Sequence, residues 1–286
     1  MNAVDLVILA GGLGARFGGD KALAAVDGRG QILLEYTLYD VHLAGVERAV
    51  LVVREEDEGK FAPLIKRWRG RMEIALAYQT PPSAYGYERT KPLGTGHALL
   101  CAQNKVKGDF VLANADDYYG RDAVALAVVS AAKGRPAVVG YPLGETVPRE
   151  GWVSRAVLVE KEGYLEGIVE CRAHLVGERI IVEDGKCRRS LPSSVPVSLN
   201  LFALPRSIFA EAGRAFGRFL LEAGEGDECL LTQVVSAYLA RGGRVAVLSS
   251  PDRWVGMTYS RDRSGVKAYL EGMVRAGFYP EELARG

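Results

Sequence analysis

Residues 8–23, which read ILAGGLGARFGGDKAL, contain five glycines and only three charged side chains, those of Arg16, Asp20 and Lys21. Glycine lets backbone N–H groups approach a ligand without a Cβ in the way. The planar guanidinium of Arg16 can grip two phosphate oxygens, and the ammonium of Lys21 adds a point charge. The run therefore predicts a loop that binds a phosphate group. The alternative is a glycine-rich connection with two solvated cations.

Two well-known phosphate-binding patterns do not fit this loop. A dinucleotide fingerprint that starts at Gly12 and Gly14 would need glycine or alanine where Phe17 stands. The Gly-Lys-Ser/Thr ending of a P-loop is absent from the run as well. Both of these interpretations are therefore weakened.

Short apolar runs alternate with helical stretches through the first half of the chain. The predicted strands cover residues 4–10, 49–53, 74–78, 110–113 and 137–139, and the predicted helices cover 33–44, 58–68, 95–103 and 122–132. Such alternation is typical of βαβ units and a mainly parallel sheet covered on both faces. The glycine loop follows the first predicted strand, and ligands of open α/β sheets bind beyond the carboxyl ends of the strands.

The second half of the chain no longer alternates single strands with single helices. WVSRAVLVEKEGYLEGIVE at 152–170 predicts two strands around a Glu-Gly turn, and VSLNLFAL at 197–204 predicts a further strand. Helices are expected near 207–221 and 228–240, followed by a strand at 244–248 and a last helix with apolar residues at helical spacing. We therefore predict a single domain over residues 1–286 with a β-rich insertion around 142–205.

Composition and charge argue against several other classes of protein. With 36 basic and 35 acidic side chains the formal net charge is +1, which gives no overall field for binding nucleic acid or an anionic membrane. No apolar run approaches the roughly 20 residues of a membrane span, and the start of the chain lacks the basic flank of a signal peptide. The four cysteines stand far apart, which favours reduced thiols over a zinc site or disulfides. We expect a cytoplasmic protein without nucleic-acid or membrane partners.

Four stretches of the chain are distinctive in combination: LAGGLGARFGGDKAL at 9–23, ERTKPLGTGHALLCAQ at 88–103, VLANADDYYG at 111–120 and VSLNLFAL at 197–204. In this order they resemble the sugar-1-phosphate nucleotidyltransferases, also called NDP-sugar pyrophosphorylases. The resemblance runs over almost the whole chain. It implies an α/β fold of the Rossmann-like nucleotide-diphospho-sugar transferase type, with a mixed, mainly parallel sheet, helices on both faces and a β insertion.

The reaction that this resemblance implies is attack by a sugar phosphate oxygen on the α-phosphorus of a nucleoside triphosphate, with pyrophosphate leaving. Because the attacking phosphate is already ionised near neutral pH, catalysis consists mainly of screening and aligning two polyanions. No general base is required. This agrees with a chain whose three histidines, His42, His97 and His174, stand beside no obvious nucleophile pattern.

The resemblance also implies roles for the loop residues. The nucleotide-binding backbone is that of Leu9, Ala10, Gly11, Gly12 and Gly14. Arg16 is expected to face the leaving pyrophosphate, and Lys21 the α-phosphate or the incoming sugar phosphate. Asp116 is expected to hold Mg²⁺. A carboxylate beside a triphosphate would otherwise be repelled, and a hard cation bound by its oxygen removes this repulsion. Arg16, Lys21 and Asp116 are therefore the candidate catalytic residues.

Gln79 ends the third predicted strand and, with Gly94 and Thr95, occupies the place where relatives read the edge of a nucleobase. A side-chain amide donates and accepts in one plane, which suits the imide edge of uracil or thymine. Lys91 is expected to add a phosphate contact. We therefore expect UTP or dTTP as the nucleotide, and the alternative for Gln79 is a polar residue at a strand end.

The expected acceptor is a sugar 1-phosphate. In GYLEGIVECRA, Glu170 stands where relatives bind sugar hydroxyls, and Arg172 lies near their phosphate-binding lysine with a spacing off by one residue. Ser198 and Asn200 interrupt an apolar strand, either as pocket contacts or as a satisfied edge-strand pair. Asp117 is either a further ligand contact or an exposed loop acid.

The chain departs from the resemblance in RWVGMTYSRD at 253–262, because many relatives carry a second metal-binding Asp where Gly256 stands. Asp252 in a shifted loop, or a water molecule, would have to replace it. Two rival hypotheses stay open: transfer of GMP to a molybdenum cofactor, which GGDKAL at 18–23 also suits, and a non-catalytic sensor that binds a nucleotide sugar and regulates a partner. The formation of a homo-oligomer stays open as well.

Overall fold

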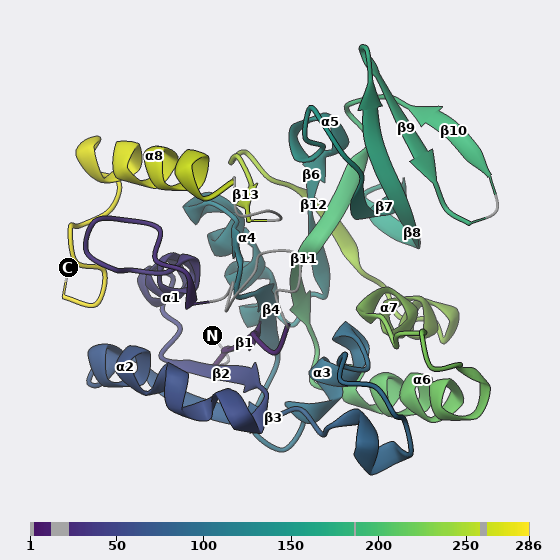
Figure 1. Ribbon diagram of the computed structural model, residues 1–286, viewed down its shortest axis with the longest axis horizontal. Helices are drawn as coiled ribbons and strands as arrows, with labels where there is room; N and C mark the ends of the chain where they lie inside the picture. Colours follow the sequence, from purple (N-terminus) through teal and green to yellow (C-terminus); the bar gives the residue numbers. More distant parts are fainter. Residues whose placement is uncertain (1–2, 13–22, 186, 258–261, 286) are drawn as a thin grey trace.

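The computed structural model describes residues 3–12, 23–185, 187–257 and 262–285 of the chain. Four parallel strands make up one part of its main sheet (Figure 1): β1 (Asp5–Leu9), β2 (Arg48–Val53), β3 (Glu73–Tyr78) and β4 (Phe110–Asn114). They lie in the order β4-β1-β2-β3. The carboxyl ends of β1 and β4 meet, with Leu9 beside Asn114.

The neighbouring part of the sheet is mixed. β11 (Pro196–Leu204) lies antiparallel between β4 and β6 (Ala137–Pro142), and β12 (Ala246–Ser249) pairs in parallel with β6. A register shift between Ser198 and Phe202 interrupts the pairing of β11 with β6. Asn200 lies within this bulge and has a φ of 66°, a left-handed conformation that asparagine tolerates better than most residues. The bulge thus marks a special position in a central strand.

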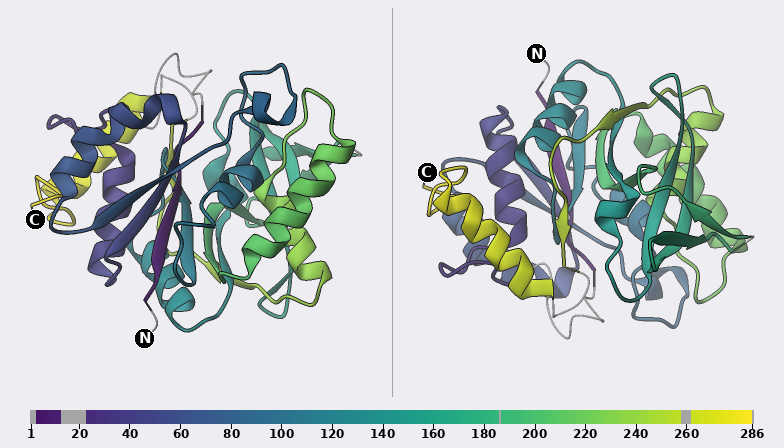
Figure 2. Two further views of the ribbon diagram at one scale, coloured as in Figure 1. Left: turned by 90° about the horizontal axis from the view of Figure 1, so that it is seen from below. Right: turned by 90° about the horizontal axis from the view of Figure 1, so that it is seen from above.

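Helices cover both faces of the sheet (Figure 2). One face carries α1 (Leu33–Leu43), α2 (Glu58–Trp68), α4 (Arg121–Ala132) and α8 (Asp262–Arg275), and the other carries α3 (Thr95–Cys101), α6 (Ile208–Glu222) and α7 (Leu231–Ala240). Ala49, Leu51 and Val53 of β2 join the core beneath the first group, whereas Val50 and Val52 join the second. Since successive side chains of a strand point to opposite faces, one apolar run supports both layers.

An antiparallel extension follows β6. It consists of α5 (Leu143–Thr146), β7 (Val153–Lys161), β8 (Tyr164–Val176), β9 (Arg179–Glu183) and β10 (Arg188–Leu191). Glu162 and Gly163 join β7 to β8 with φ values of 54° and 79°, which confirms the predicted hairpin around a Glu-Gly turn. Because β7 also pairs with β11, the extension is continuous with the main sheet, whose order is β10-β9-β8-β12-β6-β11-β4-β1-β2-β3.

Two predicted elements differ from the structure by three residues at one end. The helix expected from residue 228 begins at Leu231, because Cys229 and Leu231 donate their N–H groups to the turn before α3. The strand expected to end at residue 139 continues to Pro142, since β11 pairs with β6 as far as that residue. The remaining short elements are η2 (Glu55–Asp57), η3 (Pro82–Tyr85), β5 (Asp117–Tyr118) and β13 (Val255–Gly256).

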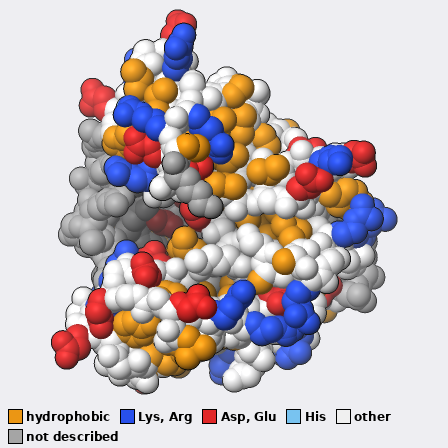
Figure 3. All heavy atoms as spheres, turned by 90° about the vertical axis from the view of Figure 1, so that its right-hand side faces the viewer, with side chains coloured by type: hydrophobic (Ala, Val, Ile, Leu, Met, Phe, Trp, Pro, Cys, Tyr) orange, Lys and Arg blue, Asp and Glu red, His pale blue; other side chains and the backbone are white. Residues whose placement is uncertain are grey.

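The surface shows little segregation of charge. On the face that carries β9, β10, α6 and α7, acidic and basic side chains lie next to one another, and the surface is hollowed between the strands and the helices (Figure 3). This mixture agrees with a formal net charge of +1. Among the helices that the structure describes, none is long and apolar enough to cross a membrane.

Candidate active site

The carboxyl ends of β1 and β4 bring two predicted parts of the site together. Ala10 extends β1 by donating its N–H to the carbonyl of Val52 (2.8 Å), and Ala115 extends β4 by donating to that of Leu9 (3.1 Å). The glycine loop therefore starts beside Asp116. Three predicted residues of the loop fall outside the described part of the chain: Gly14, Arg16 and Lys21.

Gln79 reaches the start of the glycine loop from the end of β3. Its backbone N–H bonds to the carbonyl of Val53 (2.8 Å), so it continues the sheet. A Cβ on Gly11 would lie 2.1 Å from Gln79 Oε1, so glycine makes room for this amide. Gln79 Oε1 is buried and has no hydrogen-bond partner among the described residues. Because buried polar atoms usually have a partner, we expect a hydrogen-bond donor at this oxygen. The contact joins the predicted base-reading residue to the predicted phosphate loop.

Gly94 and Thr95 form a turn at the start of α3 that the segment before α7 holds in place. Gly94 has a φ of 105°, and a Cβ there would lie 2.4 Å from the carbonyl oxygen of Cys229. The same carbonyl accepts the N–H of Gly96 (2.8 Å), and Thr95 Oγ1 accepts the N–H of Leu231 (2.8 Å). The threonine hydroxyl therefore fixes the start of α7, and the contact of this turn with a nucleobase stays a prediction.

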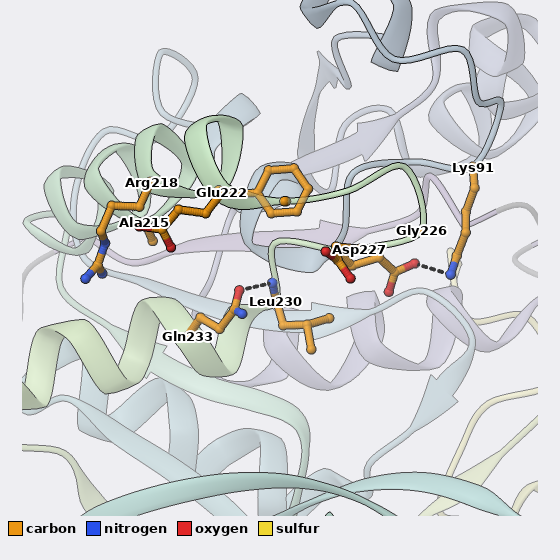
Figure 4. A pocket seen from close by; sticks show the side chains of 11 residues that line it. Lys91, Ala215, Arg218, Glu222, Gly226, Asp227, Leu230 and Gln233 are labelled. Atoms are coloured by element: carbon orange, nitrogen blue, oxygen red, sulfur yellow. Dashed lines mark hydrogen bonds and ion pairs between the residues drawn. The ribbon is translucent and has the colours of Figure 1, made fainter. Parts of the chain in front are cut away.

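Lys91 is engaged in an ion pair. Its Nζ lies 2.6 Å from Glu228 Oε1 at the edge of a cavity of about 700 Å³ beside α6 and α7 (Figure 4). Since 62% of the lysine side chain is exposed, we expect the pair to contribute at most about 1 kcal/mol to stability. A phosphate contact from Lys91 would require this exposed pair to open, and the contact stays a prediction.

A polar network holds Asp117 at the end of β4. Asp117 is 8% exposed, and its Oδ2 accepts a hydrogen bond from Asn114 Nδ2 (2.8 Å). Asn114 Oδ1 in turn accepts one from Asn200 Nδ2 (3.4 Å), and the Tyr119 hydroxyl donates to the carbonyl of Leu199 (2.8 Å). The network connects Asp117 to Asn200, two predicted sugar-binding residues. It also excludes the exposed-acid interpretation of Asp117.

Ser198 supports the bulge that presents Asn200. Its side chain is buried, and its Oγ accepts the backbone N–H of Asn200 (3.1 Å). β11 pairs with β4, β6 and β7, so it is a central strand and the edge-strand alternative is wrong. Ser198 therefore helps to shape the position of Asn200.

Glu170 and Arg172 lie on one face of β8, apart from this network. Glu170 Oε1 accepts a hydrogen bond from the Thr232 hydroxyl (3.1 Å) at the start of α7. The guanidinium of Arg172 lies 4.9 Å from the ring centroid of Trp152, a cation–π contact. Since Leu231 binds the turn before α3, the start of α7 links Glu170 to the predicted base-binding turn.

Position 256 has no room for a second carboxylate in this arrangement. Gly256 pairs with Asp117 through β13 and β5. A Cβ there would lie 2.1 Å from Cζ2 of Trp254 and 2.7 Å from Oδ1 of Asp117. Asp252 caps α4, because its Oδ2 accepts the N–H of Ala123 (2.9 Å), and its role as a replacement ligand stays a prediction. The departure from the resemblance is thus a difference in local packing.

We expect Gly256→Asp to lower the free energy of unfolding by about 1–3 kcal/mol, because the indole of Trp254 must move and a second carboxylate must lie beside Asp117. Urea unfolding of both proteins measures the change. Gly59→Asp serves as the matched control, since a Cβ on Gly59 meets no atom within 4 Å and Gly59 lies in the first turn of α2. A Gly256→Asp protein as stable as the control would contradict the packing argument.

The residues at this edge of the sheet fit Mg²⁺ with one protein carboxylate. Mg²⁺ is commonly bound through one or two carboxylates, and substrate phosphates and water complete its coordination. Asp116 lies between β4 and β5, partly exposed and next to the start of the glycine loop. In the described ranges, no group of three or more His, Cys, Asp or Glu side chains is arranged to hold a metal. A metal here would depend on Asp116 and on the oxygens of the nucleotide.

His97 is a core residue. Its side chain is 1% exposed and packs against the ring of Phe216 with centroids 4.6 Å apart. Burial lowers the pKa of His97 to about 4, so the imidazole is neutral near pH 7. That His97 transfers no proton stays a prediction.

Four residues near Asp117 are not singled out by the sequence: Asn114, Tyr119, Arg155 and Trp254. Asn114 carries a weak signal, as the polar end of the apolar run FVLAN, and Arg155 is a lone cation in an apolar strand. Asn114 and Tyr119 lie close to Asp117 in the sequence, whereas Arg155 and Trp254 come near it through the pairing of β7 with β11 and of β13 with β5, which local patterns do not predict.

The comparisons with known proteins identify the family. Residues 6–183 match the MobA-like NTP transferase domain. The match covers more than half of the chain, and the chain belongs to this family. The resemblance to nucleotidyltransferases is therefore confirmed.

Two curated relatives match part of the chain. The bifunctional protein GlmU of Hyphomonas neptunium is 34% identical over 104 residues, which cover 36% of this chain and 19% of GlmU. The bifunctional IPC transferase and DIPP synthase of Thermococcus kodakarensis is 33% identical over 125 residues, which cover 43% of this chain and 26% of that protein. The matches thus span about a fifth and a quarter of the relatives' lengths.

Two solved structures share the fold over nearly the whole chain. The inositol-1-phosphate CTP transferase from T. maritima has a TM-score of 0.63 and 15% identity, covering 95% of this chain and 96% of the other. The UTP-bound UGPase from Acinetobacter baumannii has a TM-score of 0.64 and 15% identity, covering 99% and 97%. The predicted Rossmann-like nucleotide-diphospho-sugar transferase fold is therefore confirmed.

Proposed function

We propose that this chain is a Mg²⁺-dependent nucleotidyltransferase that joins a sugar 1-phosphate to a nucleoside triphosphate, UTP or dTTP, and releases pyrophosphate in the cytoplasm. Membership of the MobA-like NTP transferase domain family supports the reaction class. The meeting of the glycine loop with Asp116 supports the location of the chemistry at the carboxyl ends of β1 and β4.

The observation that carries the proposal is the contact between Gly11 and Gln79. The amide occupies the space that a Cβ on Gly11 would fill, and its buried Oε1 lacks a partner among the described residues. Uracil and thymine present an N–H between two carbonyl oxygens, which one side-chain amide and one backbone N–H can satisfy. A nucleotide whose base meets Gln79 would place its phosphates along the adjoining glycine loop.

The proposed mechanism uses charge and alignment. Arg16 binds the pyrophosphate that leaves, and Lys21 binds the α-phosphate where the acceptor attacks. Asp116 would hold Mg²⁺, which screens phosphate charge and orients the oxygens when bound. The acceptor phosphate is ionised near neutral pH, so its oxygen attacks without a base.

The proposed acceptor pocket lies around Asp117 and Asn200. Their joint network and the strained backbone of Asn200 support it, since such conformations persist where the surroundings impose them. Glu170, hydrogen-bonded to the start of α7, and Arg172, stacked on Trp152, would extend the pocket along β8.

Base preference tests this proposal. We expect UTP or dTTP to be favoured over ATP, GTP and CTP by roughly tenfold to a hundredfold in kcat/KM, because an unpaired buried polar group costs about 1–3 kcal/mol. Gln79→Ala should erode this preference more than it lowers the maximal rate. The measurement is kcat/KM for the five triphosphates with an active sugar 1-phosphate.

The matched control is Gln103→Ala, which removes an exposed amide just beyond the end of α3 and should leave the preference unchanged. A wild-type preference for a purine would contradict the role given to Gln79 even if nucleotidyl transfer were observed.

A second candidate is the transfer of GMP to a molybdenum cofactor, which GGDKAL at 18–23 also suits. In that case GTP would be the preferred triphosphate and sugar 1-phosphates would be inert. The regulatory alternative predicts binding of a nucleotide sugar without release of pyrophosphate. The same panel of substrates therefore separates the three.

A further inference from the structure

Arg155 is a buried cation in the antiparallel extension. It lies on β7 opposite Cys171 of β8 and is 8% exposed. Its Nε donates to Thr146 Oγ1 (3.0 Å), its Nη1 donates to the carbonyl of Ser154 (2.7 Å), and its Nη2 donates to the carbonyl of Thr146. The guanidinium is therefore held in one orientation by α5 and its own strand.

All three of these acceptors are neutral oxygens. No carboxylate of the described residues lies within ion-pair distance of Arg155, although buried charges in proteins are usually paired. Burial lowers the pKa of Arg155 to about 10, so the side chain remains charged near pH 7. The fold thus maintains a desolvated positive charge whose hydrogen bonds to the described residues all go to neutral oxygens.

The guanidinium lies on the Asp117 side of the candidate active site. Its Cζ is 5.0 Å from the ring centroid of Trp254, whose indole edge lies against Gly256. Gly256 is paired with Asp117, and the Asp117 carboxylate acts electrostatically on Arg155. These contacts form a continuous path from Arg155 to the residue that follows Asp116.

Both side chains of this path retain donors. A guanidinium has five N–H groups. Three of those of Arg155 are used in the bonds above, which leaves two for a ligand. Trp254 Nε1 is buried and lacks an acceptor among the described residues. Two N–H groups on a rigid planar fork suit the oxygens of a phosphate.

We propose that Arg155 forms the anion subsite for the acceptor, where it binds the phosphate of a phosphomonoester next to Trp254. The proposal rests on the function proposed above, in which that phosphate attacks the nucleotide. It places a phosphate-binding group on β7 in addition to Arg172 of β8, whose guanidinium stacks on Trp152. The subsite would select phosphorylated acceptors over neutral sugars.

Calorimetry of the full chain with Mg²⁺ tests this. α-D-Glucose 1-phosphate and inorganic phosphate are the probes, glucose is the neutral control, and each titration is run with and without a non-hydrolysable UTP analogue that fills the nucleotide site. We expect Arg155→Gln to weaken binding of both anions on the order of tenfold to a hundredfold while the affinity for the analogue stays within about twofold. Thr146→Val, which removes the hydroxyl that accepts from Nε and donates to the carbonyl of Leu143 but keeps the carbonyl that accepts from Nη2, should weaken them less.

Equal anion affinity in wild type and Arg155→Gln would overturn the assignment, as would failure of the wild type to bind either anion. Parallel loss of anion and analogue binding with a lowered Tm would assign Arg155 a structural role. If only the analogue fails to bind the wild type, the proposed function fails, and the nucleotide-free titrations still decide the role of Arg155.

A second measurement does not depend on how well Arg155→Gln folds. The ¹⁵N resonance of the Arg155 Nε–H in the wild type, identified by its absence from Arg155→Lys, should shift on addition of α-D-glucose 1-phosphate and stay unchanged with glucose. An unchanged resonance at saturating glucose 1-phosphate would contradict the subsite.

Discussion

Asp116→Asn is expected to lower turnover on the order of 10²-fold or more, because it removes a charge that acts on the metal-bound phosphates mainly in the transition state. The change keeps the shape of the side chain, and the backbone carbonyl of Asp116, which accepts the N–H of Met257 (3.4 Å), is unaffected. The fold should therefore persist. The measurement is kcat at saturating substrates over a series of Mg²⁺ concentrations.

The matched control for this variant is Asp122→Asn, on an exposed carboxylate in the first turn of α4, which should leave kcat unchanged. Asp117→Asn would be a poor control, because it would turn an amide donor toward Asn114 Nδ2. Near-normal turnover of Asp116→Asn at saturating Mg²⁺ would remove Asp116 from the metal site.

Lys21→Ala is expected to lower kcat by about 10²–10³-fold with little change in nucleotide affinity, since its charge meets the α-phosphate where charge develops. Arg16→Ala should instead weaken binding of the triphosphate and of pyrophosphate on the order of tenfold, because it loses a bidentate contact. Single-turnover kinetics and competition by pyrophosphate measure the two effects separately.

Lys133→Ala, at the exposed C-terminal end of α4, controls for the loss of a lysine at the surface. Identical kinetic profiles for Lys21→Ala and Arg16→Ala would refute the division of roles between the two cations.

Much of the fold could be predicted because its central elements follow local patterns. The helix at Glu58–Trp68 has the predicted bounds, and β2 differs by one residue from the predicted strand. Apolar runs buried on both faces and helices with one apolar stripe leave clear periodicities in the sequence. The Glu-Gly hairpin was predictable for a similar reason, since Gly163 adopts the positive φ that such a turn requires.

Features set by contacts distant in sequence were not predictable. The bulge at Asn200 depends on pairing with β4 and β6, and the start of α7 depends on hydrogen bonds to the turn before α3. The same holds for packing at Gly256, where the indole of Trp254 fills the space that a side chain would occupy. Local residue types do not carry this information.

The candidate site, like the fold, could be predicted from the sequence only in part. Motifs were sufficient to propose Gln79 and Gly11 as parts of one site, and the structure brings them into contact. They were not sufficient for Arg155, which only strand pairing brings toward Asp117. The phosphate contact of Lys91, which is paired with Glu228, stays a prediction.

The most direct test of the proposed function is release of pyrophosphate by the full chain from UTP and dTTP in the presence of Mg²⁺, with and without a panel of sugar 1-phosphates. The account predicts that at least one sugar 1-phosphate produces pyrophosphate and the corresponding NDP-sugar in equal amounts, and that Asp116→Asn abolishes most of this release. Pyrophosphate release from GTP with a molybdenum cofactor alone, or from no triphosphate with any sugar 1-phosphate, would contradict it.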